Sequence, residues 1–128
     1  MPSTRVETAS GWLGDRQADF LEAIQQALME GILIPENDRD IRLTQYDPAD
    51  MLKHAGGSPR HTNIEITLFA GRTIEAKRRL YAALVTRLAP FGLEPVDIKV
   101  VLIEVDRHNW GLRGLPASEI DLGFKVEV

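Results

Sequence analysis

Pro2 occupies the position in this chain with the clearest potential for chemistry. Inside a chain, the nitrogen of proline belongs to an amide and has no useful basicity. If Met1 is removed, as expected before so small a residue, the Pro2 nitrogen becomes a free secondary amine. An α-amino group has a pKa of about 7.7–8.0, and apolar surroundings lower it because they disfavour the charged form. Such a base suits general acid–base catalysis, although proline in second position also occurs in proteins where it has no chemical role.

Arg72 is a second candidate, because it follows Gly71 at an expected turn between a strand and a helix. A guanidinium near a helix N-terminus offers a planar pair of donors to a carboxylate and can stabilise the charge that develops on an enolate. A solvated arginine in the first helical turn, paired with Glu75, is the structural alternative.

The histidines do not indicate a metal site. His54, His61 and His108 lie in connectors without the spacing of metal ligands, so we expect them to be solvated loop side chains. The chain has no cysteine, which excludes disulfides, thiolate catalysis and cysteine-based metal sites. We therefore expect neither a metal nor a cofactor.

Size and charge narrow the class of protein. A chain of 128 residues has the common size of one domain, and we expect a single domain over residues 1–128. The net charge of −4, with Lys and Arg scattered along the chain, argues against nucleic acid or an anionic membrane as a partner. No apolar run approaches membrane-spanning length and the start lacks a leader pattern, so a cytoplasmic protein is the default expectation.

The first half of the chain predicts a strand, a helix and a second strand. Residues 3–8 and 41–46 alternate in the way that strands do, and apolar residues at helical spacing fall within residues 16–30. Asp15 is expected to cap this helix, and Gly31 is expected to end it.

The second half predicts the same elements again. Residues 63–70 form a strand, Thr73 opens a helix that runs to about residue 91, and residues 98–105 form the most apolar strand. The glycines of residues 106–128 indicate short extended pieces around a loop.

The two halves, roughly residues 2–60 and 61–128, align at one offset, which shortens by one residue after the turn that follows the helix. The aligned pairs include Ala23 with Ala83, Leu28 with Leu88, Pro35 with Pro95, Asp38 with Asp97 and Leu43 with Leu102. Two strands joined through a helix should be parallel, with a right-handed crossover. The sequence therefore predicts an α/β (α+β) fold: two β-α-β units that form a four-stranded mixed sheet with both helices on one face.

The other face of this sheet is expected to need a cover. Val100 and Leu102, with Ile64 and Ile66 or their opposites, would make that face apolar. An apolar sheet face without a cover requires a partner, so a homo-oligomer is expected. The C-terminal segment is the alternative cover.

Four short motifs occur in a fixed order after Pro2. They are Pro35-x-Asn37-Asp38-Arg39, Gln45-x-x-Pro48-x-x-Met51, Arg72-Thr73-x-Glu75-x-Lys77, and Trp110 in a glycine-rich loop. Together with the repeat, this order resembles the tautomerase superfamily, which includes 4-oxalocrotonate tautomerase, and most closely its malonate semialdehyde decarboxylase branch. The resemblance spans nearly the whole chain.

The resemblance implies a trimer with active sites at the subunit boundaries, where the short C-terminal strands would lie, and Pro2 as the proton shuttle of each site. Arg72 would hold the substrate carboxylate, and Asp38 matches an aspartate thought to position or activate water. Turn chemistry is the structural alternative for Asp38. Trp110 would line the pocket, and the structural alternative is that it anchors the C-terminal loop.

This chain also departs from the decarboxylase pattern. Ala70 stands where that branch has a second arginine, and Leu112 replaces an aromatic residue. Arg113 could supply the missing cation, and we place it with Trp110 and Leu112 among the expected substrate-binding residues.

The expected function is thus a cofactor-independent tautomerase that acts on a small 2-oxo or enol carboxylate, with Pro2 as acid and base and Arg72 as anchor. One alternative is a decarboxylase or hydratase that uses Pro2, Asp38 and Arg72. Another is a trimeric binding protein that keeps the fold without turnover.

Overall fold

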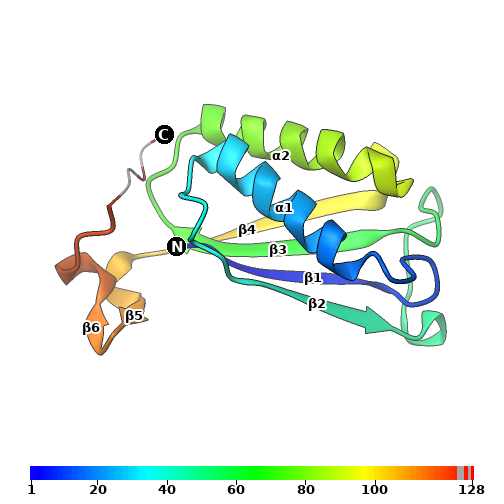
Figure 1. The fold of residues 1–128 in the computed structure, drawn as a ribbon, viewed down its shortest axis with the longest axis horizontal. Coiled ribbons are helices and arrows are strands. Elements are labelled where there is room, and N and C mark those ends of the chain that lie inside the picture. Colours follow the sequence, from blue (N-terminus) through cyan, green and yellow to red (C-terminus); the bar gives the residue numbers. More distant parts are fainter. Residues whose placement is uncertain (124–125, 127) are drawn as a thin grey trace.

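A four-stranded mixed sheet forms the centre of the computed structural model, which describes residues 1–123, 126 and 128. Its spatial order is β2-β1-β3-β4, and Figure 1 shows the strands side by side below the helices. The β1–β2 and β3–β4 pairs are parallel, as the repeat predicts, and the antiparallel β1–β3 pair makes the sheet mixed. The strands are β1 (Ser3–Ala9), β2 (Ile41–Tyr46), β3 (Thr62–Phe69) and β4 (Ile98–Val105).

Two helices, α1 (Gln17–Ile32) and α2 (Ile74–Leu88), lie side by side on one face of the sheet (Figure 1). The α2 helix begins as predicted, because the Thr73 hydroxyl accepts a hydrogen bond from the Ala76 amide at 3.1 Å. It ends at Leu88, and a short 3₁₀ turn carries the chain on to Phe91.

Both expected ends of α1 were wrong. Arg16, not Asp15, precedes its first turn, and no side chain among the described residues caps it. The helix continues through Gly31 and ends only where Leu33 adopts a left-handed conformation, with φ of 56°. Gly31 serves a different purpose, since a Cβ atom there would clash with the Cα of Leu80 on α2. The glycine allows the two helices to pack closely.

The core lies between the helices and the sheet. Phe20 of α1 packs edge-to-face against Trp12 and Phe91, with ring centroids 5.6 and 5.2 Å apart. Full burial of each large apolar side chain contributes about 1.5–3 kcal/mol. The almost fully buried members of this core include Val6, Phe20, Ile24, Leu28, Ile64, Ile66, Leu80, Leu84 and Leu88.

The expected arrangement of the sheet faces was wrong. Ile64 and Ile66 are buried under the helices, and Val100 and Leu102 pack against the same core. Because side chains alternate along a strand, Val101 and Ile103 of β4 point to the uncovered face, where they are 43% and 40% exposed. Charged pairs such as Arg5–Glu65 also occur on the strands there, so that face is mixed rather than apolar.

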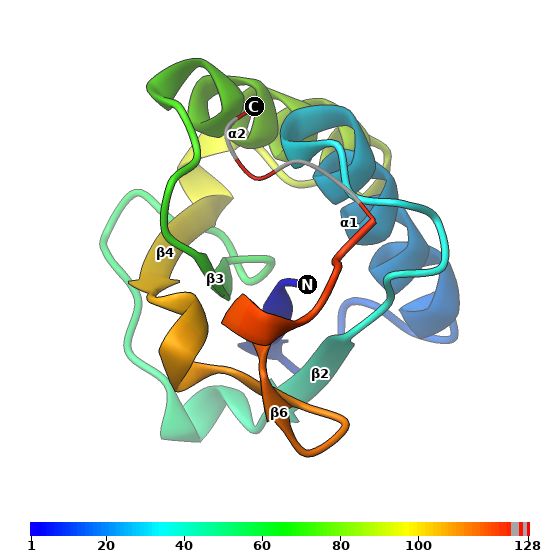
Figure 2. The same cartoon turned by 90° about the vertical axis from the view of Figure 1, so that its left-hand side faces the viewer.

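The chain after β4 leaves the sheet and curls around its end. The strands β5 (Gly111–Leu112) and β6 (Leu115–Pro116) form a small hairpin there. Figure 2 shows the N-terminus in the middle of this end, with the C-terminal segment passing in front of it. The Val128 carbonyl accepts hydrogen bonds from Thr73 and Arg79 at the start of α2. The expected short extended pieces are therefore present.

Neither helix in the described part of the chain is long and apolar enough to span a membrane.

Candidate active site

A cavity of about 340 Å³ opens at the end of the sheet where β1 begins. Three parts of the chain enclose it: the loop between α1 and β2, the β5–β6 hairpin, and the C-terminal segment, all gathered around the N-terminus in Figure 2. Its lining residues are Met1, Pro35, Asn37, Asp38, Leu112, Arg113, Ile120, Asp121 and Leu122.

The amino terminus lies against this cavity. In the structure Met1 is present, so the free amine belongs to Met1 and the nitrogen of Pro2 is an amide. The Pro2 residue itself is buried. The Met1 nitrogen lies 3.6 Å from Oδ2 of Asp38. Burial lowers the pKa of the Met1 amine to about 6; the Asp38 charge opposes this shift, and the Arg72 and Arg107 charges add to it.

Asp38 is a buried carboxylate held by its backbone. Its amide donates to the Pro35 carbonyl at 3.1 Å, and its own carbonyl accepts from Nε2 of Gln25 at 3.0 Å. Its Oδ2 atom is buried and accepts no hydrogen bond from the described residues, although the Met1 amine is nearby. Burial raises the pKa of Asp38, against the charge of the amino terminus. An amine with a lowered pKa beside a carboxyl with a raised one is typical of sites where protons move.

Arg72 is buried rather than solvated. Its Nη1 donates to the Ile32 carbonyl at 2.6 Å, so the guanidinium meets the C-terminal end of α1, where a cation is favourable. Arg72 does not line the cavity, yet its charge lowers the pKa of the Met1 amine. The structure thus places Arg72 near the amino terminus, with Nη1 of its guanidinium bound to helix α1.

The three expected substrate-binding residues separate into two groups. Trp110 packs edge-on against Phe69, with ring centroids 4.9 Å apart, and lies outside the cavity lining. Leu112 and Arg113 line the cavity. Arg113 has a left-handed backbone, with φ of 53°, in the turn between β5 and β6. The structure therefore brings Leu112 and Arg113 to the terminus and to Asp38, and sets Trp110 behind them.

Arg107 is a charged neighbour of this site that the sequence analysis missed. It follows β4, its Cζ lies 5.7 Å from the centre of the Phe69 ring, and its charge reaches the Met1 amine. A signal was available, because β3 and β4 are parallel and their carboxyl ends meet at one edge of the sheet. Arg72 and Arg107 follow those two ends. Ile120, Asp121 and Leu122 gave no local signal.

His61 differs from the expected solvated loop residue. It is buried, with its ring edge against His54 at a centroid distance of 5.1 Å, and its carbonyl accepts from the Thr8 hydroxyl at 2.8 Å. His54 and His108 are exposed. Among the described residues, no three His, Asp or Glu side chains gather where they could hold a metal ion.

Comparisons with known proteins agree with this geometry. A family model described as "Tautomerase enzyme" matches residues 38–113. A probable tautomerase of Ralstonia nicotianae is 38% identical over 56 residues, which are 43% of this chain and 80% of that protein.

Solved structures extend the comparison over most of the chain. A malonate semialdehyde decarboxylase inhibited by 3-bromopropiolate is 33% identical, with a TM-score of 0.78 over 85% of this chain and 87% of that one. A fused 4-OT described as a symmetric trimer is 28% identical, also with a TM-score of 0.78, over 90% of this chain and 95% of that one. Because the family model matches more than half of the chain and the fold is shared, the chain belongs to the tautomerase family, whose members perform tautomerisation or related catalysis.

Proposed function

We propose that this chain moves a proton within a small enol or 2-oxo carboxylate, with Pro2 as the proton carrier once Met1 has been removed. The observation that supports this most is the position of the amino terminus, which lies at a cavity within 3.6 Å of the buried Asp38 carboxylate.

Removal of Met1 would transfer the free amine to the nitrogen of Pro2. Met1 lines the cavity and its side chain is 44% exposed, whereas Pro2 is buried. The cavity would gain the volume of the Met1 side chain, and the new amine would lie one residue deeper. Because burial already lowers the pKa of the more exposed Met1 amine, we expect the pKa of the Pro2 nitrogen to be lowered as well.

In the proposed reaction, neutral Pro2 takes the hydroxyl proton of the enol and returns a proton to the adjacent carbon. The O–H bond breaks and a C–H bond forms, while the C=C bond becomes a single bond and the C–O bond becomes C=O, so no other reactant is needed. Negative charge develops on the enolate oxygen, and the cations Arg72 and Arg107 near the terminus would stabilise it.

The cavity lining favours one kind of substrate. Arg113 contributes a guanidinium that would bind a carboxylate, while Leu112, Ile120 and Leu122 offer apolar surface. Asp121 would repel a second carboxylate at that wall. We therefore propose a monocarboxylate with an apolar substituent rather than a dicarboxylate.

Decarboxylation or hydration is the second candidate, because this chain is 33% identical to a malonate semialdehyde decarboxylase and carries the buried Asp38 beside the amine. Ala70 occupies the position of one of the two arginines that this chemistry is expected to use. Asp38→Asn separates the two candidates. Chemistry that uses water should fall by about 10²–10⁴-fold in this variant, whereas simple tautomerisation should fall only a few-fold.

We also propose a trimer of single-domain subunits. One similar structure is described as a symmetric trimer, and exposed Val101 and Ile103 lie on the uncovered face of the sheet. Analytical ultracentrifugation should give three times the mass of one chain, and a monomer would contradict this assembly.

The function is tested with the purified protein, whose intact mass must first show that Met1 is absent. A panel of enol monocarboxylates and dicarboxylates is then assayed for ketonisation with the wild type and with Pro2→Ala. We expect kcat to fall by about 10²-fold or more in the variant, which keeps an amine but loses the ring. Equal rates in the two proteins would remove Pro2 from the reaction, and no turnover of any enol by the wild type would leave a binding protein.

A further inference from the structure

Gln25 is a polar residue on the buried face of α1. It is 1% exposed and lies between apolar residues that pack against the sheet. An amide in such a place is costly unless it is hydrogen-bonded. The other buried residues of the helix are Phe20, Ile24, Ala27, Leu28, Gly31 and Ile32.

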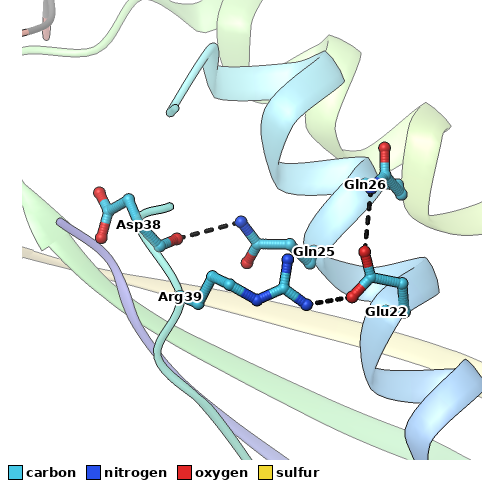
Figure 3. A network of polar contacts seen from close by, with 5 residues as sticks. All are labelled: Glu22, Gln25, Gln26, Asp38 and Arg39. Atoms are coloured by element: carbon cyan, nitrogen blue, oxygen red, sulfur yellow. Dashed lines mark hydrogen bonds and ion pairs between the residues drawn. The ribbon is translucent and has the colours of Figure 1, made fainter. Parts of the chain in front are cut away.

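The amide of Gln25 bonds to the backbone of Asp38. Its Nε2 donates to the Asp38 carbonyl at 3.0 Å, and Figure 3 shows the Asp38 carboxylate on the other side of the chain, turned away from Gln25. One helical turn earlier, Glu22 pairs with Arg39, the next residue of the same loop (Figure 3). Helix α1 therefore holds two successive residues, one through a buried contact and one at the surface, where ion pairs contribute little.

The internal repeat shows that the fold does not require this amide. The offset that pairs Ile24 with Leu84 places Val85 of α2 where α1 has Gln25. In the second half, the turn that matches Asp38 contains Asp97, whose carboxylate is bound by Ser58 and Glu94. In the second half, where other groups hold the aspartate, apolar Val85 suffices at this helix position. We therefore connect the amide of Gln25 with the Asp38 turn and not with helix packing.

We propose that Gln25 is a positioning residue, which fixes the Asp38 turn through its carbonyl and so holds the Asp38 carboxylate beside the amino terminus. This inference rests on the proposed function, in which that terminus carries the proton.

The charges around the terminus determine what loss of this contact would do. Asp38 favours the protonated amine, whereas Arg72 and Arg107 disfavour it; Asp40 and Arg72 act in turn on Asp38. If the turn relaxes and Asp38 moves away, the two arginines and burial remain. The pKa of the amine should then fall further below its ordinary value.

The test compares four variants of the full chain with Met1 removed. Gln25→Met keeps the length of the side chain without its amide, and Gln25→Val installs the residue of the second half. Gln26→Met is the matched control, since Gln26 is the neighbouring glutamine and its amide bonds only to Glu22 among the described residues. Asp38→Asn removes the charge that Gln25 is proposed to position.

The measurement is an NMR titration of the ¹⁵N-labelled Pro2 nitrogen, with thermal unfolding and kcat/KM recorded alongside. We expect both Gln25 variants to lower the pKa of Pro2 in the same direction as Asp38→Asn, and to lower kcat/KM about fivefold, the effect of one hydrogen bond. Gln26→Met should match the wild type.

Three results would contradict parts of this account. A wild-type pKa in both Gln25 variants, while Asp38→Asn shifts it, would overturn the positioning role and leave the proposed function intact. Loss of the folded state in both Gln25 variants would also overturn it, because Gln25 would then serve the fold. An unchanged pKa in Asp38→Asn would instead reject the role of Asp38 in the proposed function.

Discussion

Asp38 and Asp97 occupy matching turns of the internal repeat, at opposite ends of the sheet. Asp97 is fully buried, and its carboxylate accepts three hydrogen bonds: from the Ser58 amide and hydroxyl, both at 2.8 Å, and from the Glu94 amide at 2.9 Å. Asp38 is almost as buried, but its Oδ2 accepts no hydrogen bond from the part of the chain that the structure describes, and the Met1 amine lies 3.6 Å away.

The two carboxyl groups consequently differ in acidity. Burial alone would raise the pKa of both. At Asp97 the hydrogen bonds from Ser58 and Glu94 outweigh burial and hold the pKa below its ordinary value, whereas at Asp38 burial prevails and the pKa is raised. A carboxylate whose hydrogen bonds are satisfied stabilises the turn that contains it. A buried carboxylate with an unsatisfied oxygen beside an amine retains the capacity to exchange protons.

The neighbours of each turn explain the difference. At the Asp97 end, the loop before β3 supplies Ser58 and buries His61. At the Asp38 end, the corresponding space contains the amino terminus and the cavity with Arg113. One repeated unit therefore gives a structural turn at one end and a candidate active site at the other.

The largest expected effect comes from covering the amine. An N-terminal extension that is not cleaved would turn the nitrogen of Pro2 into an amide and leave Asp38 without its partner. We expect kcat/KM for enol ketonisation to fall by about 10²–10⁴-fold, and proteolytic release of the extension directly before Pro2 to restore it. Full activity with the extension in place would show that the site does not use a free amine.

Asp97→Asn should affect stability instead. We expect urea denaturation to show a loss of about 2 kcal/mol in the free energy of unfolding. The substitution removes the negative charge that strengthens three buried hydrogen bonds. The kcat/KM of the folded protein should not change. Asp38→Asn is the matched variant, and it should alter the free energy of unfolding by less than about 1 kcal/mol. The opposite pattern would reverse the roles assigned to the two turns.

The same pair predicts a dependence of stability on acid. The folded pKa of Asp97 lies below the unfolded value of 3.8, so its contribution is complete above that value and is lost as the pH falls through the folded pKa. The wild type should therefore lose more stability than Asp97→Asn when urea denaturation is repeated below pH 3.8. Parallel losses in the two proteins would assign the acid sensitivity to other groups.

A smaller effect is expected from the cation in the cavity. Arg113→Ala should raise KM for a monocarboxylate about tenfold with little change in kcat, because a bound carboxylate loses one charged partner. Arg60→Ala is the control at the Asp97 end, where Arg60 lies against Gly92 far along the sheet from the cavity. An unchanged KM in Arg113→Ala would remove this residue from substrate binding.

Much of the fold follows from local sequence patterns. Alternation along the strands and helical spacing between them predicted all four strands of the main sheet and both helices. The repeat predicted the two parallel pairs, because each β-α-β unit must contain one. The covered face could not be predicted in β4, where Val100, Val101, Leu102 and Ile103 are apolar on both sides.

The site was less accessible to sequence analysis. Asp38, Leu112 and Arg113 do line the cavity, but their roles stay predictions. The environment of Arg72 and Arg107 depends on the end of α1 and on parallel strand ends, contacts between residues far apart in the chain. Gln25 gave no signal, because a glutamine in a helix predicts nothing until its partner is known.

The pH dependence of wild-type kcat/KM tests the central claim most directly, with the enol substrate that turns over fastest. We predict a rise with pH whose midpoint lies below about 8, the ordinary pKa of an α-amino group, and equals the pKa of the Pro2 nitrogen measured by NMR. A rate that does not change as that nitrogen titrates would contradict the account.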